Sequence, residues 1–333
     1  MPNPLTEQDH LVTGRREILL YLLVSYLVYP QISWSEQKGL PRIAVIFPQS
    51  PSFDQPLREQ LAARGFVEDK TVKIDWRSYK TWDASMESIV TELVLSTPDV
   101  IVVAGTPATR AVLRQTKTIP VVFDVGDPLA TGLLSSLSHP DRNATGVSTT
   151  SVEASAKLFD LVTQLVPDAS RILVVRNPLN PLAVKMTDQI RSMSVDGKAH
   201  VSFLDANNAD ELVAALRRIT KHRADAILVP TDLVFRAGKE GIVRAVHKTG
   251  LPAVYQDLSL AEAGGLMAYG PDGSEIAQTE ARMVERILQG AKPADLPVEQ
   301  VTRLKLVVNL KTAKALGITI PESILLRADA VIR

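Results

Sequence analysis

Nearly continuous apolar runs alternate along the chain with segments whose apolar positions recur every three or four residues. The first run, residues 42–47, is typical of a strand that is buried on both faces of a parallel sheet. The next segment places Leu57, Leu61 and Ala62 on one helical face and ends at Gly65, a residue that commonly stops a helix. Because this alternation continues, the pattern predicts right-handed βαβ units and a doubly wound α/β sheet.

The same order of segments occurs twice in the chain. The matched pairs are residues 42–46 with 171–175, 98–103 with 224–229, and 119–123 with 251–255. A period of this size is too long for a solenoid, whose repeats are about 20–50 residues long. The repetition therefore predicts two similar Rossmann-like α/β lobes, one after the other.

The last segment, residues 264–333, is too short for a third lobe, so we expect the chain to cross back between the two lobes. The first lobe would comprise residues 36–147 and about 264–292. The second lobe would comprise residues 148–263 and about 293–333. Several crossings make a hinge, and a hinged pair of lobes closes on a ligand.

The first residues of the chain predict an export signal over residues 1–35. Arg15 and a second arginine precede an uncharged apolar run at 18–28, and Ser33 and Ser35 supply the small residues of a cleavage site near Ser35. The run has 11 residues, whereas a membrane-spanning helix needs about 20. We expect a periplasmic protein, exported by a general or a twin-arginine signal; the alternatives are an uncleaved anchor or a buried helix.

The composition narrows the classes of partner. The 333 residues carry 37 basic and 37 acidic side chains, and this balance gives no electrostatic reason to expect nucleic acid. The absence of cysteine excludes disulfides, cysteine zinc sites, thiol nucleophiles and a lipidated cysteine anchor. We expect a monomer with no cofactor and no metal.

Ligands of open α/β sheets bind outside the carboxyl ends of the strands, and here those ends carry small and polar residues. The expected ligand-binding residues are Ser50, Gly105, Thr106, Asp127, Asn177, Asn180, Asp232, Tyr255, Gln256 and Tyr269. Backbone N–H groups near Thr106 would suit a carboxylate, and Asp127 or Asp232 would accept from an amine. Aromatic walls would come from Phe53, Tyr255 and Tyr269. Each polar residue also has a simpler interpretation as a helix cap.

Seven ordered motifs carry a resemblance to a known family. They are residues 104–108, 126–132, 143–148, 177–181, 262–270, 292–300 and 309–317. In these motifs the chain, from about 41 to 332, resembles the ABC-transporter substrate-binding proteins that include the tryptophan- and tyrosine-type binding proteins of bacteria. The resemblance implies a type I periplasmic-binding fold, a small organic solute in the cleft, and delivery to a membrane permease with a separate ATPase.

Two other classes of function compete with a receptor. An enzyme finds little support, because no G-x-G-x-x-G follows the first strand and no P-loop or G-x-S-x-G occurs. The five histidines show no metal-ligand spacing. A ligand-sensing subunit of a membrane signalling system remains the alternative, because fold does not determine function. Permease and ATPase genes beside this one would favour the importer.

Overall fold

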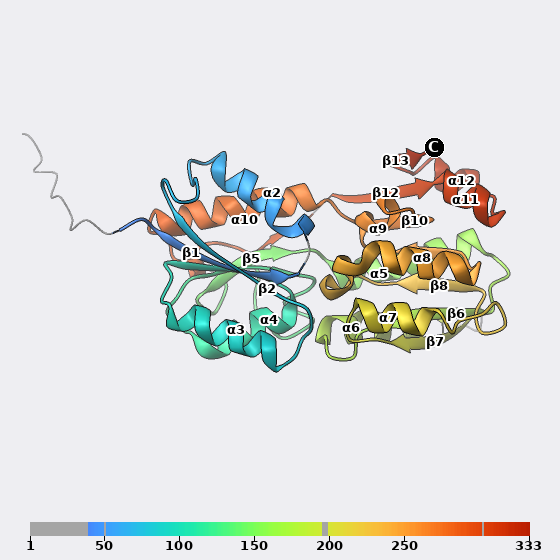
Figure 1. The fold of residues 1–333 in the computed structure, drawn as a ribbon, viewed down its shortest axis with the longest axis horizontal. Helices are drawn as coiled ribbons and strands as arrows, with labels where there is room; N and C mark the ends of the chain where they lie inside the picture. Colours follow the sequence, from blue (N-terminus) through green and yellow to red (C-terminus); the bar gives the residue numbers. More distant parts are fainter. Residues whose placement is uncertain (1–38, 50, 195–198, 302) are drawn as a thin grey trace, which may run out of the picture. The chain divides into compact units, whose positions relative to one another are not determined.

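The computed structural model describes residues 39–49, 51–194, 199–301 and 303–333 (Figure 1). Leu40–Arg333 form one structural unit. The expected export signal and Ser50 lie outside the described residues. Across the described ranges, no helix has both the length and the apolar character needed to cross a bilayer.

The first lobe is built on a six-stranded parallel sheet with the order β11-β5-β4-β3-β1-β2. Its strands are β1 (Arg42–Pro48), β2 (Lys73–Tyr79), β3 (Val100–Ala104), β4 (Val121–Val125), β5 (Ala144–Ser148) and β11 (Glu299–Gln300). Its helices are α2 (Pro51–Ala62), α3 (Ala84–Leu95), α4 (Thr106–Gln115) and α10 (Gly273–Leu288). Helix α2 packs on α10 and α3 packs on α4, and the two pairs cover opposite faces of the sheet (Figure 1). Strands β3, β4 and β5 are buried along their whole length, which explains why β3 is apolar at every position and β4 at every position except Asp124.

The second lobe is built on a seven-stranded sheet with the order β13-β12-β10-β9-β8-β6-β7, in which β12 runs antiparallel to β10. Its strands are β6 (Arg171–Arg176), β7 (His200–Asp205), β8 (Ala226–Val229), β9 (Ala253–Tyr255), β10 (Met267–Pro271), β12 (Leu304–Asn309) and β13 (Ala330–Ile332). Its helices are α5 (Ser151–Leu165), α6 (Pro181–Met193), α7 (Ala209–Leu216), α8 (Lys239–Thr249), α9 (Leu258–Glu262), α11 (Leu310–Leu316), α12 (Glu322–Leu325) and the 3-10 helix η1 (Leu233–Gly238).

Corresponding hydrogen bonds mark the internal repeat. In the first lobe Asp99 Oδ2 accepts from the backbone N–H of Arg42 at 2.8 Å, and in the second Asp225 Oδ2 accepts from that of Arg171 at 2.8 Å. Asp99 lies just before β3, which pairs in parallel with β1, the strand that begins at Arg42. Asp225 likewise lies just before β8, which pairs in parallel with β6, the strand that begins at Arg171. The prediction of two α/β lobes built on mostly parallel sheets is confirmed.

The chain crosses between the sheets later than we expected from the sequence. Strand β10 pairs with β9 and β12 of the second sheet, so the return to the first lobe follows Pro271 rather than residue 264. Strand β11 pairs with β5 of the first sheet, so the last crossing follows Gln300 rather than residue 292. Thr145 Oγ1 also donates to the carbonyl of Leu296 at 2.8 Å, which fastens this segment to the first lobe. The apolar pattern of a strand indicates that it is buried but not which sheet it joins.

Candidate functional site

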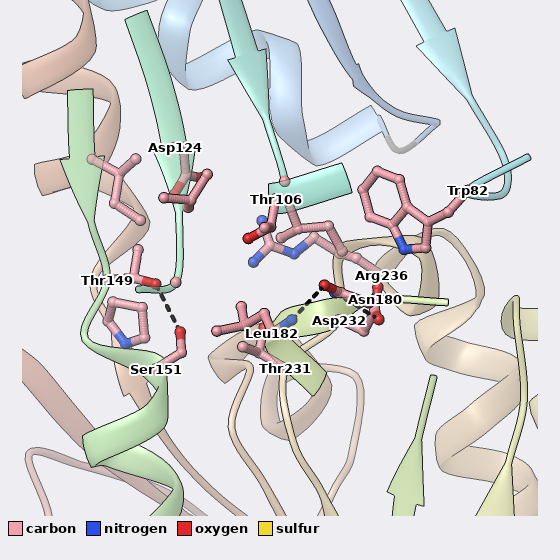
Figure 2. Close-up of a pocket in the computed structure, with 16 residues that line it drawn as sticks. Trp82, Thr106, Asp124, Thr149, Ser151, Asn180, Leu182, Thr231, Asp232 and Arg236 are labelled. Carbon is pink, nitrogen blue, oxygen red and sulfur yellow. Dashed lines mark hydrogen bonds between the residues drawn. The ribbon is translucent and has the colours of Figure 1, made fainter. Parts of the chain in front are cut away.

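A pocket lies between the carboxyl ends of the two sheets, where strand ends of both lobes meet (Figure 2). Its empty volume is about 480 Å³, including the opening to solvent. The residues that line it are Trp82, Gly105, Thr106, Asp124, Val125, Gly126, Thr149, Ser151, Asn180, Leu182, Thr231, Asp232, Leu233, Arg236, Pro271 and Ile276. Both lobes and two of the segments that connect them therefore contribute to one site.

The first-lobe wall is formed where β3 turns into α4. Gly105 has φ +94°, and a Cβ atom there would stand 2.5 Å from Cη2 of Trp82, so glycine is needed for both reasons. Thr106 begins α4, and Pro107 in its first turn needs no N–H partner. The Nε1 of Trp82 and the Oγ1 of Thr106 are buried, and neither reaches hydrogen-bond geometry with a described residue, although the Trp82 indole is near enough to Asp232 to lower the pKa of that carboxyl. The pocket thus has two polar atoms that a ligand would satisfy.

Asp232 provides the carboxylate of the second-lobe wall. Its Oδ1 accepts from the backbone N–H of Val234 at 3.2 Å, which caps η1, and its Oδ2 accepts from Asn180 Nδ2 at 3.1 Å. Asn180 in turn caps α6 through Leu182 N at 3.0 Å. Burial raises the pKa of Asp232 to about 6, although the hydrogen bonds from Asn180 and Val234 act in the opposite direction.

Asp124 provides a matching carboxylate from the first lobe. It lies in β4 and is 7% exposed, and burial raises its pKa to about 6, against the lowering effect of the Arg236 charge. Glu280 of α10 is also buried, and burial together with the Asp124 charge raises the pKa of Glu280 well above its ordinary value. Burial beside Asp124 therefore disfavours the charged form of Glu280.

Arg236 is the cation in the pocket lining. It belongs to η1, and its side chain extends from the second lobe into the pocket (Figure 2). Its Nε donates to Asp257 Oδ2 at 2.6 Å. Burial alone would raise the pKa of Asp257, but the charge and hydrogen bond of Arg236 hold that pKa below its ordinary value.

Four of the residues expected from the sequence line the pocket, namely Gly105, Thr106, Asn180 and Asp232. Two others lie close behind it. Gln256 donates through Nε2 to the carbonyl of Ser151 at 2.8 Å and accepts from Thr231 N at 3.2 Å, so it supports two lining residues. Asn177 is fully buried, and its side-chain amide lowers the pKa of Asp232. The Nδ2 of Asn177 nevertheless has no hydrogen-bond partner among the described residues.

The remaining expected residues lie elsewhere. Asp127 is not a lining residue, and its carboxylate caps the following turn by accepting from Ala130 N at 2.8 Å. Tyr255 is fully buried in the second-lobe core. Tyr269 lines a separate hollow with Thr150 and Lys157.

Twelve of the sixteen lining residues were not among the expected site residues, and three of these twelve carry a charge or a large aromatic ring, namely Trp82, Asp124 and Arg236. Trp82 follows the end of β2 by three residues, so the strand-end rule that selected Thr106 would have found it too. Asp124 lies inside a strand, and Arg236 lies four residues beyond Asp232. Only the folded chain shows that both reach the pocket.

Three comparisons identify the family. The family model described as ABC transporter substrate binding protein matches residues 45–332. A tyrosine-binding protein of Clostridioides difficile (strain R20291) is 24% identical over 272 residues, which cover 80% of this chain and 78% of that protein. A solved conserved domain protein from Vibrio cholerae is 28% identical, with a TM-score of 0.79, and covers 88% of this chain and 100% of its own. A structure from Streptococcus pneumoniae, described as an ABC domain in complex with L-Trp, is 27% identical, with a TM-score of 0.78 and the same two coverages. The chain belongs to the ABC transporter substrate-binding proteins, a family of solute-binding proteins rather than of enzymes.

Proposed function

We propose that this protein is the periplasmic receptor of an ABC importer, and that it captures an amino acid between its lobes by hinge closure. The observation that carries the proposal is the pair of nearly buried carboxylates in one pocket, Asp124 from the first lobe and Asp232 from the second. A solute ammonium group that interacts with both would favour the form in which the lobes are together. The loaded receptor would then deliver its solute to a membrane permease powered by a separate ATPase.

The lining also offers places for the other parts of an amino acid. Backbone N–H groups at the start of α4, beside Thr106, suit a carboxylate. The indole of Trp82 offers a flat apolar surface and an N–H donor that lies near Asp232 without reaching hydrogen-bond geometry. The names of two relatives, one a tyrosine-binding protein and the other solved with L-Trp, support an aromatic amino acid.

The connections between the lobes support hinge closure. The chain passes from one sheet to the other after β5, after β10 and after β11. Hinges are formed by a few residues at the ends of such elements. Thr150, at the first crossing, has φ +48°, a left-handed conformation that is uncommon for a β-branched residue. A change of backbone angles there would let the lobes separate without disturbing either sheet.

The test is a thermal-shift screen of the mature protein against the amino acids and a set of sugars, followed by calorimetric titration. A ligand at 100 times its dissociation constant should stabilise the protein by about 2.7 kcal/mol. Asp232→Asn should weaken binding of the amino acid about 10-fold or more, since a charge-assisted hydrogen bond is lost. Asp127→Asn should leave the affinity unchanged because Asp127 lies outside the lining. Stabilisation by sugars alone, or full affinity in both Asp232→Asn and Asp124→Asn, would contradict the amino-acid assignment.

A further inference from the structure

Tyr79 and Trp82 form an aromatic pair beside the pocket. The centroids of the two rings are 4.7 Å apart and the ring planes are tilted by 44°, a geometry that aromatic pairs favour. Trp82 lines the pocket (Figure 2). Tyr79 is 2% exposed and is not one of the lining residues. Any effect of Tyr79 on a solute in this pocket is therefore indirect.

The position of Tyr79 is fixed by the sheet of the first lobe. It is the last residue of β2, the edge strand, and its hydroxyl donates to the carbonyl of Ala104 at 2.8 Å. Ala104 ends β3, and β1 lies between β2 and β3 in the sheet. The hydrogen bond therefore reaches past the end of β1 to the residue just before Gly105. A strand end on one side and a buried hydrogen bond on the other leave the phenol ring little freedom to turn.

Trp82 has less support from its own backbone. It lies in the loop between β2, which ends at Tyr79, and α3, which begins at Ala84. One edge of its indole lies against Gly105, where an added Cβ would stand 2.5 Å from Cη2 and 3.3 Å from Cζ2 of Trp82. The Nε1 of Trp82 makes no hydrogen bond with a described residue. Contact with the Tyr79 ring and with the Gly105 backbone is therefore what holds the indole.

These contacts make the orientation of the indole depend on Tyr79. We propose that Tyr79 is the positioning residue that fixes the Trp82 ring, and that it thereby sets the preference of the pocket for an aromatic solute over an aliphatic one. Gly105 belongs to the same arrangement, because a larger residue there would push the indole out of this position. The inference rests on the proposed function and deepens it, since it names a residue that selects the class of amino acid.

The preference follows from the geometry that aromatic pairs require. A solute ring gains the extra attraction of an offset or tilted pair only when the indole presents a fixed plane to it. A mobile indole would have to be ordered on binding, and this loss of freedom would weaken the complex. An aliphatic side chain is attracted mainly by dispersion, which depends little on the angle of the ring. Loss of the Tyr79 ring should accordingly weaken aromatic solutes more than aliphatic ones.

The first experiment titrates L-tyrosine and L-leucine into the mature protein and its variants by calorimetry. Tyr79→Leu, which removes the ring, should weaken L-tyrosine about 10-fold and L-leucine by less than about 2-fold. Tyr79→Phe keeps the ring but loses the hydrogen bond to Ala104, and should weaken L-tyrosine about 3-fold. Tyr255→Phe is the matched control, because it removes a hydroxyl that is buried in the second-lobe core and has no hydrogen-bond partner among the described residues. It should leave both affinities unchanged.

The second experiment follows the indole without any solute. The chain has three tryptophans, of which Trp34 lies in the expected export signal, so Trp76→Phe leaves Trp82 as the only tryptophan of the mature protein. The fluorescence anisotropy of Trp82 should decay only with the tumbling of the whole molecule. Tyr79→Leu in this background should add a fast component on the nanosecond timescale, which reports independent motion of the side chain. Tyr79→Phe should add a smaller one.

Three results would overturn the inference while leaving the receptor function intact. They are an unchanged anisotropy decay in Tyr79→Leu, an L-tyrosine affinity in that variant equal to that of the wild type, and an equal loss of L-tyrosine and L-leucine affinity, which a purely structural tyrosine would cause. If Tyr79→Leu does not fold, Tyr79→Phe decides, and wild-type affinity together with a wild-type decay would contradict the inference. A wild type that binds neither L-tyrosine nor L-tryptophan would instead contradict the aromatic amino-acid class of the proposed function, and the role of Tyr79 with it.

Discussion

A Cβ atom added to Gly126 would stand 2.2 Å from Cδ2 of Leu182. Gly126 directly follows β4 of the first lobe, and Leu182 lies in the first turn of α6 of the second. Both line the pocket. The backbone of one lobe therefore touches a side chain of the other at the site where the solute is expected, and this contact exists only while the lobes are together.

Gly126→Ala should reduce solute affinity about 10-fold or more, because a contact of 2.2 Å forces the lobes apart in the bound form. The free energy of unfolding of the empty protein should change little, since the lobes can relieve the clash by opening. Calorimetry and thermal melts measure the two effects. Gly273→Ala, at a position where a Cβ would meet nothing within 4 Å, is the matched control. Leu182→Ala in the same chain should restore part of the affinity, and unaltered binding by Gly126→Ala alone would show that the contact has no role in closure.

Trp82→Phe should weaken binding of an aromatic amino acid about 10-fold. The substitution keeps an aromatic ring in the pocket but removes the buried indole N–H that a ligand would satisfy. Trp76→Phe is a close comparison because Trp76 Nε1 donates to Glu68 at 3.1 Å outside the pocket. The comparison variant should bind normally. Equal titration curves for the two variants would argue against a role for the Trp82 indole N–H.

The stability of the empty protein should depend on Asp232 in a pH-dependent way. The pKa of Asp232 is about 6 in the folded chain, compared with an ordinary value of 3.8. Between these two pH values the folded state therefore binds more protons than the unfolded state, and the folded state loses stability as the pH rises through this range. This difference corresponds to at most about 3 kcal/mol. Asp232→Asn, which keeps a capping side chain, should therefore raise the melting temperature at pH 7 and have little effect at pH 4. A variant that is less stable than the wild type at pH 7 would contradict this sign.

The same raised pKa values predict how binding responds to acid. An ammonium group binds the ionised forms of Asp124 and Asp232, whose pKa values are both about 6 in the empty pocket. Affinity should accordingly fall as the pH drops from 7 to 5, and titrations at constant ionic strength measure it. Asp232→Asn should bind more weakly at pH 7 and respond less to acid. An affinity that rises on acidification would argue against an ammonium partner.

Asp225 should act on stability with the opposite sign. The hydrogen bond from Arg171 lowers the pKa of Asp225 to about 2. A depressed pKa stabilises the fold above pH 3.8, and this contribution is lost as the pH falls toward 2. Asp225→Asn should thus lower the melting temperature slightly at pH 7, because the pair is exposed to solvent, and the difference should close near pH 2. A difference in melting temperature that persists at pH 2 would instead indicate that the substitution disturbs packing.

The hydrophobic pattern alone determined the two α/β lobes, because a strand that is buried on both faces must be apolar at nearly every position. It also located Gly105, Thr106, Asn180 and Asp232, since each follows a strand end, where such sheets bind ligands. Strand burial and the position of a residue after a strand are local properties, so they can be inferred from neighbouring residues in the sequence.

The partners of those residues were decided by the tertiary structure. Which sheet β10 and β11 join depends on pairing between segments far apart in the chain. Asp127 and Asp124 are equally polar and three residues apart, yet the pleat of β4 and the turn after it direct only Asp124 into the pocket. Arg236 reaches the same space because Asp257, 21 residues later, holds it there. The sequence alone does not show which group a charged side chain interacts with, because that depends on how the fold brings the two lobes together and excludes water between them.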